Sequence, residues 1–181
     1  MSQKLLNIWS ENMNIKRIKI DGFKNLKDID LTLNNITSLL SINSYGKTNT
    51  LTAIKFGFDF IVSNNENKLT QMKYTPGIPV NKNNLTNIFS FEIEAELDDE
   101  DIIYGYSFSW AKNKVKPKIL KEYLKIKEPS ESQKYTFFIK RENNESFYKP
   151  SKTGACNKPI IIEENGLILN KIQAYDDLFY M

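Results

Sequence analysis

The apolar residues of the chain follow a two-residue period over most of its length. Before residue 43, the runs NIKRIKIDGF, DIDLTL and ITSLLSI each fit a strand, and the last is apolar enough to be buried on both faces. From residue 88 onward the alternation returns in FSFEIEAEL and IIYGYSFSW, and then in the shorter runs KYTFFIK and PIII. Such alternation is typical of antiparallel strands. We therefore expect three strands followed, over residues 88–181, by an antiparallel meander.

A helical period interrupts these strands after residue 46. Leu51, Ile54, Phe58 and Ile61 are spaced by three, four and three residues, which predicts one apolar face of a helix. The polar run SNNENK predicts its end, and residues 64–87, rich in Asn, Lys, Pro and Gly, are expected to form a long loop. Strands combined with this helix predict an α+β fold.

The composition is that of a globular chain, with 40% hydrophobic and 26% charged residues among 181. The net charge of +3 permits contact with nucleotide or nucleic acid without arguing for it. The sequence contains no apolar run of about 18 residues, the length needed to span a membrane. The apolar patch near the start is too short for a signal peptide, and Cys156 has no partner for an internal disulfide. A cytoplasmic protein is expected.

The chain contains no histidine. This excludes histidine general acid–base catalysis, Ser-His-Asp triads and histidine metal ligands within this sequence.

The segment SINSYGKTNT at 41–50 lies between the third expected strand and the helix. Phosphate-binding loops follow the pattern G-x-x-x-x-G-K-[ST] in this context. Gly46 would let the backbone approach a phosphate, Lys47 would reach the β- and γ-phosphates, and the Thr48 hydroxyl would ligate Mg²⁺. The segment therefore predicts an ATP·Mg²⁺ site. An ordinary strand-to-helix turn with a solvated lysine is the alternative.

Ser41 replaces the first glycine of that pattern. If the backbone keeps the usual conformation, serine is expected to add strain of about 1–3 kcal/mol and to weaken nucleotide binding. A slightly different turn would accept serine without strain.

Residues 15–56 resemble the N-terminus of RecF/SMC/OLD-type ABC ATPases, and most closely the AAA-family ATPases of abortive-infection and phage-defence systems. The resemblance covers residues 13–62 strictly and continues more loosely to residue 126. The matching residues are Phe23, Lys24 and Asn25, followed by Asn43, Tyr45, Gly46, Lys47, Thr48 and Asn49.

The resemblance implies a P-loop ABC-ATPase-like N-lobe, with a mixed or antiparallel sheet wrapped around the P-loop helix. Residues 1–12 would be a tail and residues 13–181 the lobe, with the P-loop at 41–48. The implied ATP ligands are Ser41, Asn43, Ser44, Tyr45, Gly46, Lys47, Thr48 and Asn49, with Thr48 also on the metal.

No catalytic residue is assigned within the chain. In the family, a C-lobe supplies a signature motif, a Walker B strand and a switch histidine, and two heads enclose the nucleotides. This sequence has no such signature and no histidine. We therefore expect an N-terminal fragment or a truncated product, which requires a C-lobe or a second head for hydrolysis.

Two rival functions remain open. The chain could be a non-catalytic interaction module with a degenerate nucleotide site, pairing through strand edges with a toxin or nuclease effector. The lysine-rich run AKNKVKPKILKEYLKIK at 111–127 could instead bind the phosphates of DNA or RNA, although a solvated strand surface is the favoured explanation.

Three further motifs receive structural interpretations. The acidic run ELDDEDI is expected to be a hairpin turn rather than a metal site. The stripe Tyr104, Tyr106, Phe108 and Trp110 is expected in the core rather than stacked on bases. PIIIEENGLI is expected to be a strand ending in a turn, although Glu163 and Glu164 could form a degenerate Walker B motif.

Overall fold

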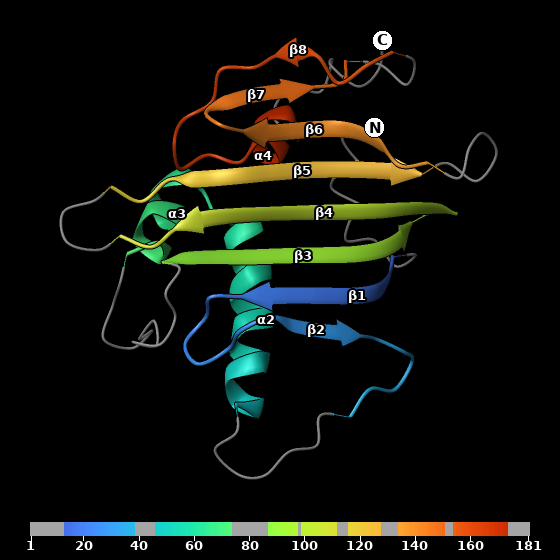
Figure 1. Cartoon of the computed structure of the whole chain (residues 1–181), viewed down its shortest axis with the longest axis vertical. Coiled ribbons are helices and arrows are strands. Elements are labelled where there is room, and N and C mark those ends of the chain that lie inside the picture. Colours follow the sequence, from blue (N-terminus) through green and yellow to red (C-terminus); the bar gives the residue numbers. More distant parts are fainter. Residues whose placement is uncertain are drawn as a thin grey trace.

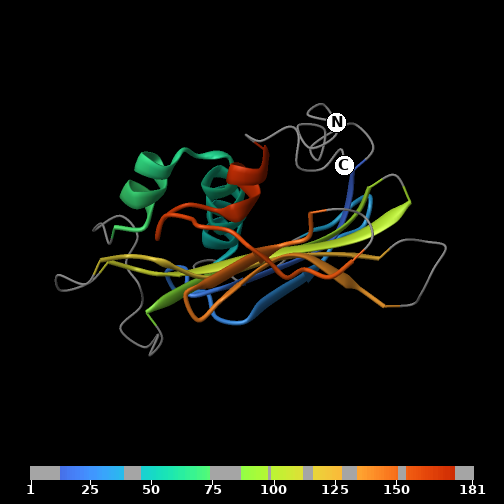
Figure 2. The same cartoon turned by 90° about the horizontal axis from the view of Figure 1, so that it is seen from above.

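Eight antiparallel strands form one sheet, and the helices lie on one of its faces (Figures 1 and 2). The computed structural model describes residues 13–38, 46–73, 87–97, 99–111, 116–127, 134–150 and 154–173. The strands are β1 (Asn14–Asp21), β2 (Ile29–Thr32), β3 (Ile88–Leu97), β4 (Glu100–Ser109), β5 (Ile119–Lys127), β6 (Thr136–Glu142), β7 (Glu145–Tyr148) and β8 (Lys158–Pro159). The helices are α2 (Lys47–Val62), α3 (Asn65–Gln71) and α4 (Ile168–Gln173). Within the described ranges, no helix has the length and apolarity needed to cross a membrane.

The strands lie in the order β2-β1-β3-β4-β5-β6-β7-β8. From β3 onward each strand pairs with the next one along the chain, as expected for a meander, and β3 and β4 stay in register from Ile88↔Ser109 to Leu97↔Glu100. This hairpin places the acidic run at its turn and confirms that interpretation. The first strand, β1, lies between β2 and β3, so the chain leaves the edge of the sheet, forms α2 and α3 and returns beside β1.

The expected ABC-ATPase-like N-lobe is wrong. The sheet of such a lobe is mixed, with parallel strands, whereas every strand pairing in this sheet is antiparallel. The sheet also does not wrap around α2, because the helices cover one face and leave the other open (Figure 2). Strand β3 shows the physical reason. Its inward-facing residues Phe91 and Ile93 alternate with Glu92 and Glu94, so one face of the strand is exposed to solvent. Parallel strands, by contrast, are usually buried and apolar on both faces.

Two local expectations also change. Residues 36–38 of the third expected strand are not in a strand, Ile36 is 88% exposed, and residues 39–42 lie outside the described part of the chain. The expected loop over 64–87 contains α3, whose first turn is capped because Asn67 N–H donates to the Asn64 side chain at 2.8 Å. Residues 74–86 of that loop lie outside the described ranges.

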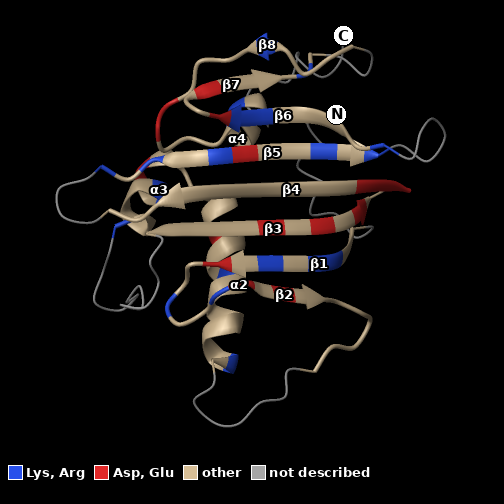
Figure 3. Cartoon of the chain, viewed as in Figure 1, with Lys and Arg blue, Asp and Glu red and all other residues tan. Residues whose placement is uncertain are grey.

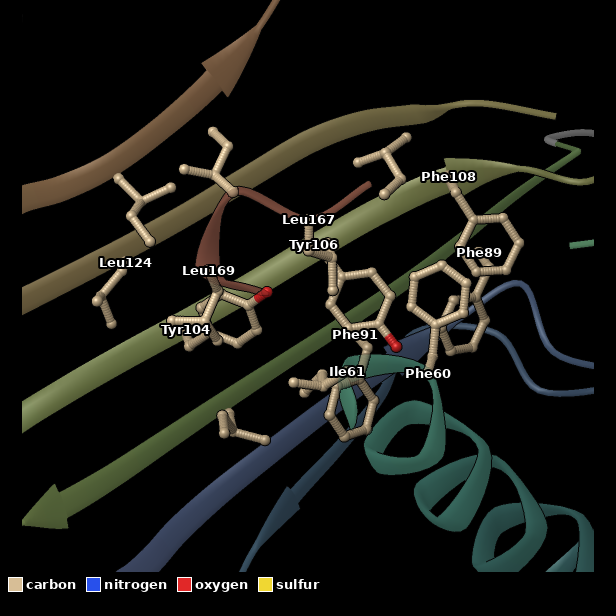
Figure 4. Close-up of a cluster of buried hydrophobic side chains, with 14 of the residues drawn as sticks. Phe60, Ile61, Phe89, Phe91, Tyr104, Tyr106, Phe108, Leu124, Leu167 and Leu169 are labelled. Carbon is tan, nitrogen blue, oxygen red and sulfur yellow. The ribbon is translucent and has the colours of Figure 1, made fainter. Parts of the chain in front are cut away.

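An aromatic core lies between α2 and the sheet (Figure 4). The Phe60 ring stacks on Tyr106, with centroids 5.0 Å apart, and on Phe108, at 4.9 Å. A Cβ atom at Gly57 would lie 2.3 Å from the Phe91 ring, so glycine is what lets α2 approach β3 so closely. The predicted core role of the aromatic stripe is confirmed by the burial of its four side chains, Tyr104, Tyr106, Phe108 and Trp110.

The predicted helix is confirmed, but part of its expected apolar face is not buried. Leu51 is 60% exposed, whereas Ala53, Gly57 and Phe60 are buried. The reason is that the first turns of α2 extend past the edge strand β2, beyond the cover of the sheet (Figure 1). This projecting end of α2 carries the predicted phosphate-binding residues.

Candidate phosphate-binding site at the start of α2

The start of α2 is built on Gly46, which directly precedes the helix. Its φ of 100° lies in the left-handed region that favours glycine. Thr50 N–H donates to the Gly46 carbonyl at 2.8 Å, so the first helical hydrogen bond closes on this residue. The first turn contains no acidic residue. Because its N–H groups have no acceptor within the helix and the helix dipole is positive there, this end of α2 favours an anion.

A tight turn after β1 approaches the same end of the helix. Phe23 is 1% exposed, and its ring lies 5.3 Å from Phe56 of α2. Leu26 N–H donates to the Phe23 carbonyl at 2.8 Å, which closes the turn. Lys24 and Asn25 form its tip, with Lys24 at a φ of 52°. The buried phenylalanine thus anchors a polar tip beside α2.

Side-chain hydrogen bonds join this tip to the first turn of α2. The Asn49 amide donates to the Asn25 side-chain oxygen at 2.6 Å, and the Lys24 ammonium donates to the Asn49 side-chain oxygen at 3.3 Å. A Cβ atom at Gly46 would lie 3.3 Å from the Asn25 amide nitrogen and 3.4 Å from Leu26 Cδ2. Two short motifs far apart in the sequence therefore meet, and Lys24 brings a cation to the positive end of the helix.

The predicted ligands divide into two groups. Gly46, Lys47, Thr48 and Asn49 lie together at the start of α2, and the Thr48 side chain is exposed. Ser41, Asn43, Ser44 and Tyr45 lie outside the described residues.

Lys24 and Asn25 were not among the predicted ligands. The signal that points to them is the F-K-N element itself, because its phenylalanine fits a buried anchor and its lysine and asparagine fit an exposed turn.

The acidic pair after β8 lies far from this corner. Glu163 and Glu164 are exposed, and Gly166 N–H donates to the Glu163 carbonyl at 3.1 Å, which confirms the predicted turn. The strand expected over PIII is wrong beyond Pro159, because β8 ends there and residues 160–162 are not in a strand. The Asn65 amide hydrogen bonds to the Glu163 carboxylate. Asn65 follows the C-terminal end of α2, and a helix of 16 residues is about 24 Å long. Glu163 therefore cannot complete a site at the helix start.

A second polar cluster is buried where α3 and α4 meet the sheet. The Glu122 carboxylate accepts the N–H groups of Ile168 and Leu169 at 2.6 and 2.9 Å and the Tyr104 hydroxyl at 3.1 Å. Lys68 donates to the carbonyl of Ser63 and to the Asn170 side chain.

Burial raises the pKa of Glu122 and lowers the pKa of Lys68 to about 8. Protein groups satisfy these hydrogen bonds: those of Glu122 hold α4 to the sheet, and those of Lys68 hold α3 to the end of α2 and to α4. The cluster therefore has a structural role.

Comparison of the chain with protein-family models, with curated proteins and with solved structures found no match.

Proposed function

We propose that the chain binds ATP together with Mg²⁺ at the N-terminal end of α2. The observation that carries the proposal is the pair of hydrogen bonds from Asn49 to Asn25 and from Lys24 to Asn49. They join the two motifs that resemble RecF/SMC/OLD-type ATPases at a helix end where no acidic residue occupies the first turn. The resemblance supports ATP as the nucleotide and a cytoplasmic role in phage defence or DNA metabolism.

Each residue has a distinct role in this proposal. The first-turn N–H groups of α2 contact phosphate oxygens, and Lys47 neutralises their charge. Lys24 adds a second cation from the turn after β1. The Thr48 hydroxyl is a hard oxygen ligand that suits Mg²⁺. Because the resemblance assigns the residues of hydrolysis to a C-lobe, we propose binding without turnover for this chain, and a second polypeptide portion for hydrolysis.

Equilibrium titration with a non-hydrolysable ATP analogue and Mg²⁺ tests the proposal. Lys47→Ala is expected to weaken binding about tenfold or more, equivalent to about 1.4 kcal/mol. The matched control is Lys55→Ala, since Lys55 lies on the same helix and pairs with Asp59 at 2.6 Å. This control is expected to bind like the wild type. Equal affinities for the wild type and Lys47→Ala would refute the site.

Two additional variants separate the metal from the nucleotide. Thr48→Ala is expected to reduce the gain in affinity that Mg²⁺ provides, while binding without Mg²⁺ stays unchanged. Lys24→Ala is expected to weaken binding at all Mg²⁺ concentrations, because its ammonium would act on the phosphates. A Thr48→Ala protein with an undiminished Mg²⁺ effect would remove Thr48 from the metal site.

A non-catalytic interaction module is the second candidate. The specific observation in its favour is that Ile36 and Ile161, which follow the edge strands β2 and β8, are 88% and 90% exposed. Exposed apolar residues beside sheet edges suit pairing with a partner chain. Ser41→Gly discriminates between the candidates, because it should tighten ATP binding in the first and change nothing in the second.

A further inference from the structure

The sheet face opposite the helices carries lysines and aromatic rings side by side on β5 and β6. Tyr123 pairs with Lys140 and Lys125 pairs with Phe137 across these strands. These four residues share one face, because Tyr123 and Lys125 are two positions apart and directly paired residues point the same way. The neighbouring Glu122 points to the helix-covered side, where it meets α4. We name the four residues Tyr123, Lys125, Phe137 and Lys140 the open-face cluster.

The open-face cluster interleaves cations with rings. The Lys125 ammonium lies 5.0 Å from the ring centroids of both Tyr123 and Phe137. The Lys140 ammonium lies 5.9 Å from the Phe137 centroid. Phe137 is 37% exposed, an unusual level for a phenylalanine within a strand. The cluster therefore presents apolar rings and positive charges at spacings of a few ångströms.

On the same face, the acidic residues Glu92 and Glu94 of β3 form ion pairs with cations of β1. On β3, Glu92 pairs with Lys19 at 2.7 Å and Glu94 pairs with Arg17 at 3.4 Å. By contrast, Lys125 and Lys140 form no ion pair with any carboxylate in the described residues. Figure 3 shows the basic positions on β5 and β6 and the acidic ones on β3, at the tip of β4 and at the start of β7. The ammonium groups of Lys125 and Lys140 are thus not held in direct ion pairs within the described part of the chain, while the nearby Glu92 carboxylate accepts the Tyr123 hydroxyl and lies within electrostatic range of Lys125.

We propose that the open-face cluster binds single-stranded nucleic acid. Unpaired bases stack on exposed aromatic rings in a sequence-tolerant way, and lysines contact the intervening phosphates. Lysines alone would suit any polyanion, but alternating rings and cations match the alternating bases and phosphates of a single strand. Duplex DNA hides its base faces and could use only the lysines. This surface lies on the opposite side of the sheet from the helices, and it does not depend on ATP binding.

Fluorescence anisotropy of a labelled oligothymidylate, measured over a series of salt concentrations, tests the proposal. The wild type is expected to bind with an affinity that falls as salt rises. Lys125→Ala combined with Lys140→Ala is expected to weaken binding and to reduce the log–log salt slope by about 1.4, since each phosphate contact on a single strand contributes about 0.7. Phe137→Leu is expected to weaken binding about fivefold or more and to leave the salt slope unchanged.

Matched controls keep the result specific. Lys55→Ala, on the helix-covered side, is expected to bind the oligonucleotide like the wild type, and so is Lys47→Ala. Conversely, the double lysine variant is expected to bind ATP like the wild type, so failure of one proposal leaves the other intact. Thermal unfolding verifies that each variant is folded.

Three results would overturn the proposal. The first is absence of salt-dependent binding by the wild type. The second is unchanged affinity in the double lysine variant. The third is a combination of two findings: duplex DNA or polyglutamate binds as tightly as the oligonucleotide, and Phe137→Leu has no effect on binding. This combination would identify a general polyanion-binding surface without base stacking.

Discussion

The carboxylate of Glu122 on β5 accepts the backbone N–H of Leu169 at 2.9 Å, so a buried acidic side chain caps the start of α4. The Ile168 N–H and the Tyr104 hydroxyl donate to the same carboxylate. Glu122→Gln replaces one carboxylate oxygen, which accepts hydrogen bonds, with an amide NH₂ group, which donates them and faces other donors. It is expected to lower the free energy of unfolding by about 1–3 kcal/mol, measured by urea denaturation.

Glu145→Gln is the matched control for this change. Glu145 is exposed at the start of β7 and lies opposite Glu142. Its substitution is expected to change stability by less than about 0.5 kcal/mol. A Glu122→Gln protein as stable as this control would contradict the capping role.

Lys68 predicts a pH dependence of stability. Burial lowers its pKa in the folded chain to about 8, from 10.5 when exposed. Between pH 8 and 10.5, Lys68 is protonated in the unfolded chain but largely neutral in the folded chain. The contribution of Lys68 to the free energy of unfolding therefore rises with pH over this range. The unfolding free energy of the wild type, minus that of Lys68→Met, is expected to increase by up to about 3 kcal/mol from pH 8 to 10.5. A difference that stays flat over this range would show that Lys68 titrates like an exposed lysine.

The alternation in the sequence predicts much of the sheet, because a two-residue period specifies which residues of a strand face the core. It does not specify which strands pair, and the antiparallel order contradicts the lobe inferred by resemblance. Helix α3 was missed because NENKLTQ has no apolar period. Glu122 shares the inward parity of Leu124, but an acidic residue at such a position gives no signal in the sequence that it is buried and caps a helix.

The candidate site was predictable only in part. The residues at 46–49 follow from a local motif, since glycine, lysine and threonine occur at fixed spacing before a helix. The contact of Asn49 with Lys24 and Asn25 depends on how α2 packs against the turn after β1. That packing is set by Phe23 in the aromatic core, a tertiary relationship that short motifs do not encode.

Gly105 predicts a coupling between two strands. A Cβ atom there would lie 2.5 Å from the Tyr123 ring, which crosses β4 so that its hydroxyl can donate to Glu92. Gly105→Ala is expected to displace the ring and cost about 1–3 kcal/mol of stability. In a double-mutant cycle with Tyr123→Ala, the two costs are expected to be non-additive by about 0.5–3 kcal/mol. Strictly additive costs would mean that the position of the Tyr123 ring does not depend on the absence of a Cβ atom at residue 105.

Gly46 and Gly154 form a matched pair that separates backbone strain from packing at the candidate site. Both have a φ near the centre of the positive range, 100° and 107°, so an alanine at either position is strained. A Cβ atom at Gly154 meets nothing within 4 Å, whereas one at Gly46 lies 3.3 Å from the Asn25 amide. Both alanine variants are expected to lose about 1–3 kcal/mol of stability through strain. In addition, Gly46→Ala, but not Gly154→Ala, is expected to weaken ATP binding, because the new Cβ atom would push the turn that carries Lys24 away from the start of α2. Urea denaturation and nucleotide titration of the two proteins measure both effects, and equal loss of ATP affinity in both variants would show that the effect is one of general stability.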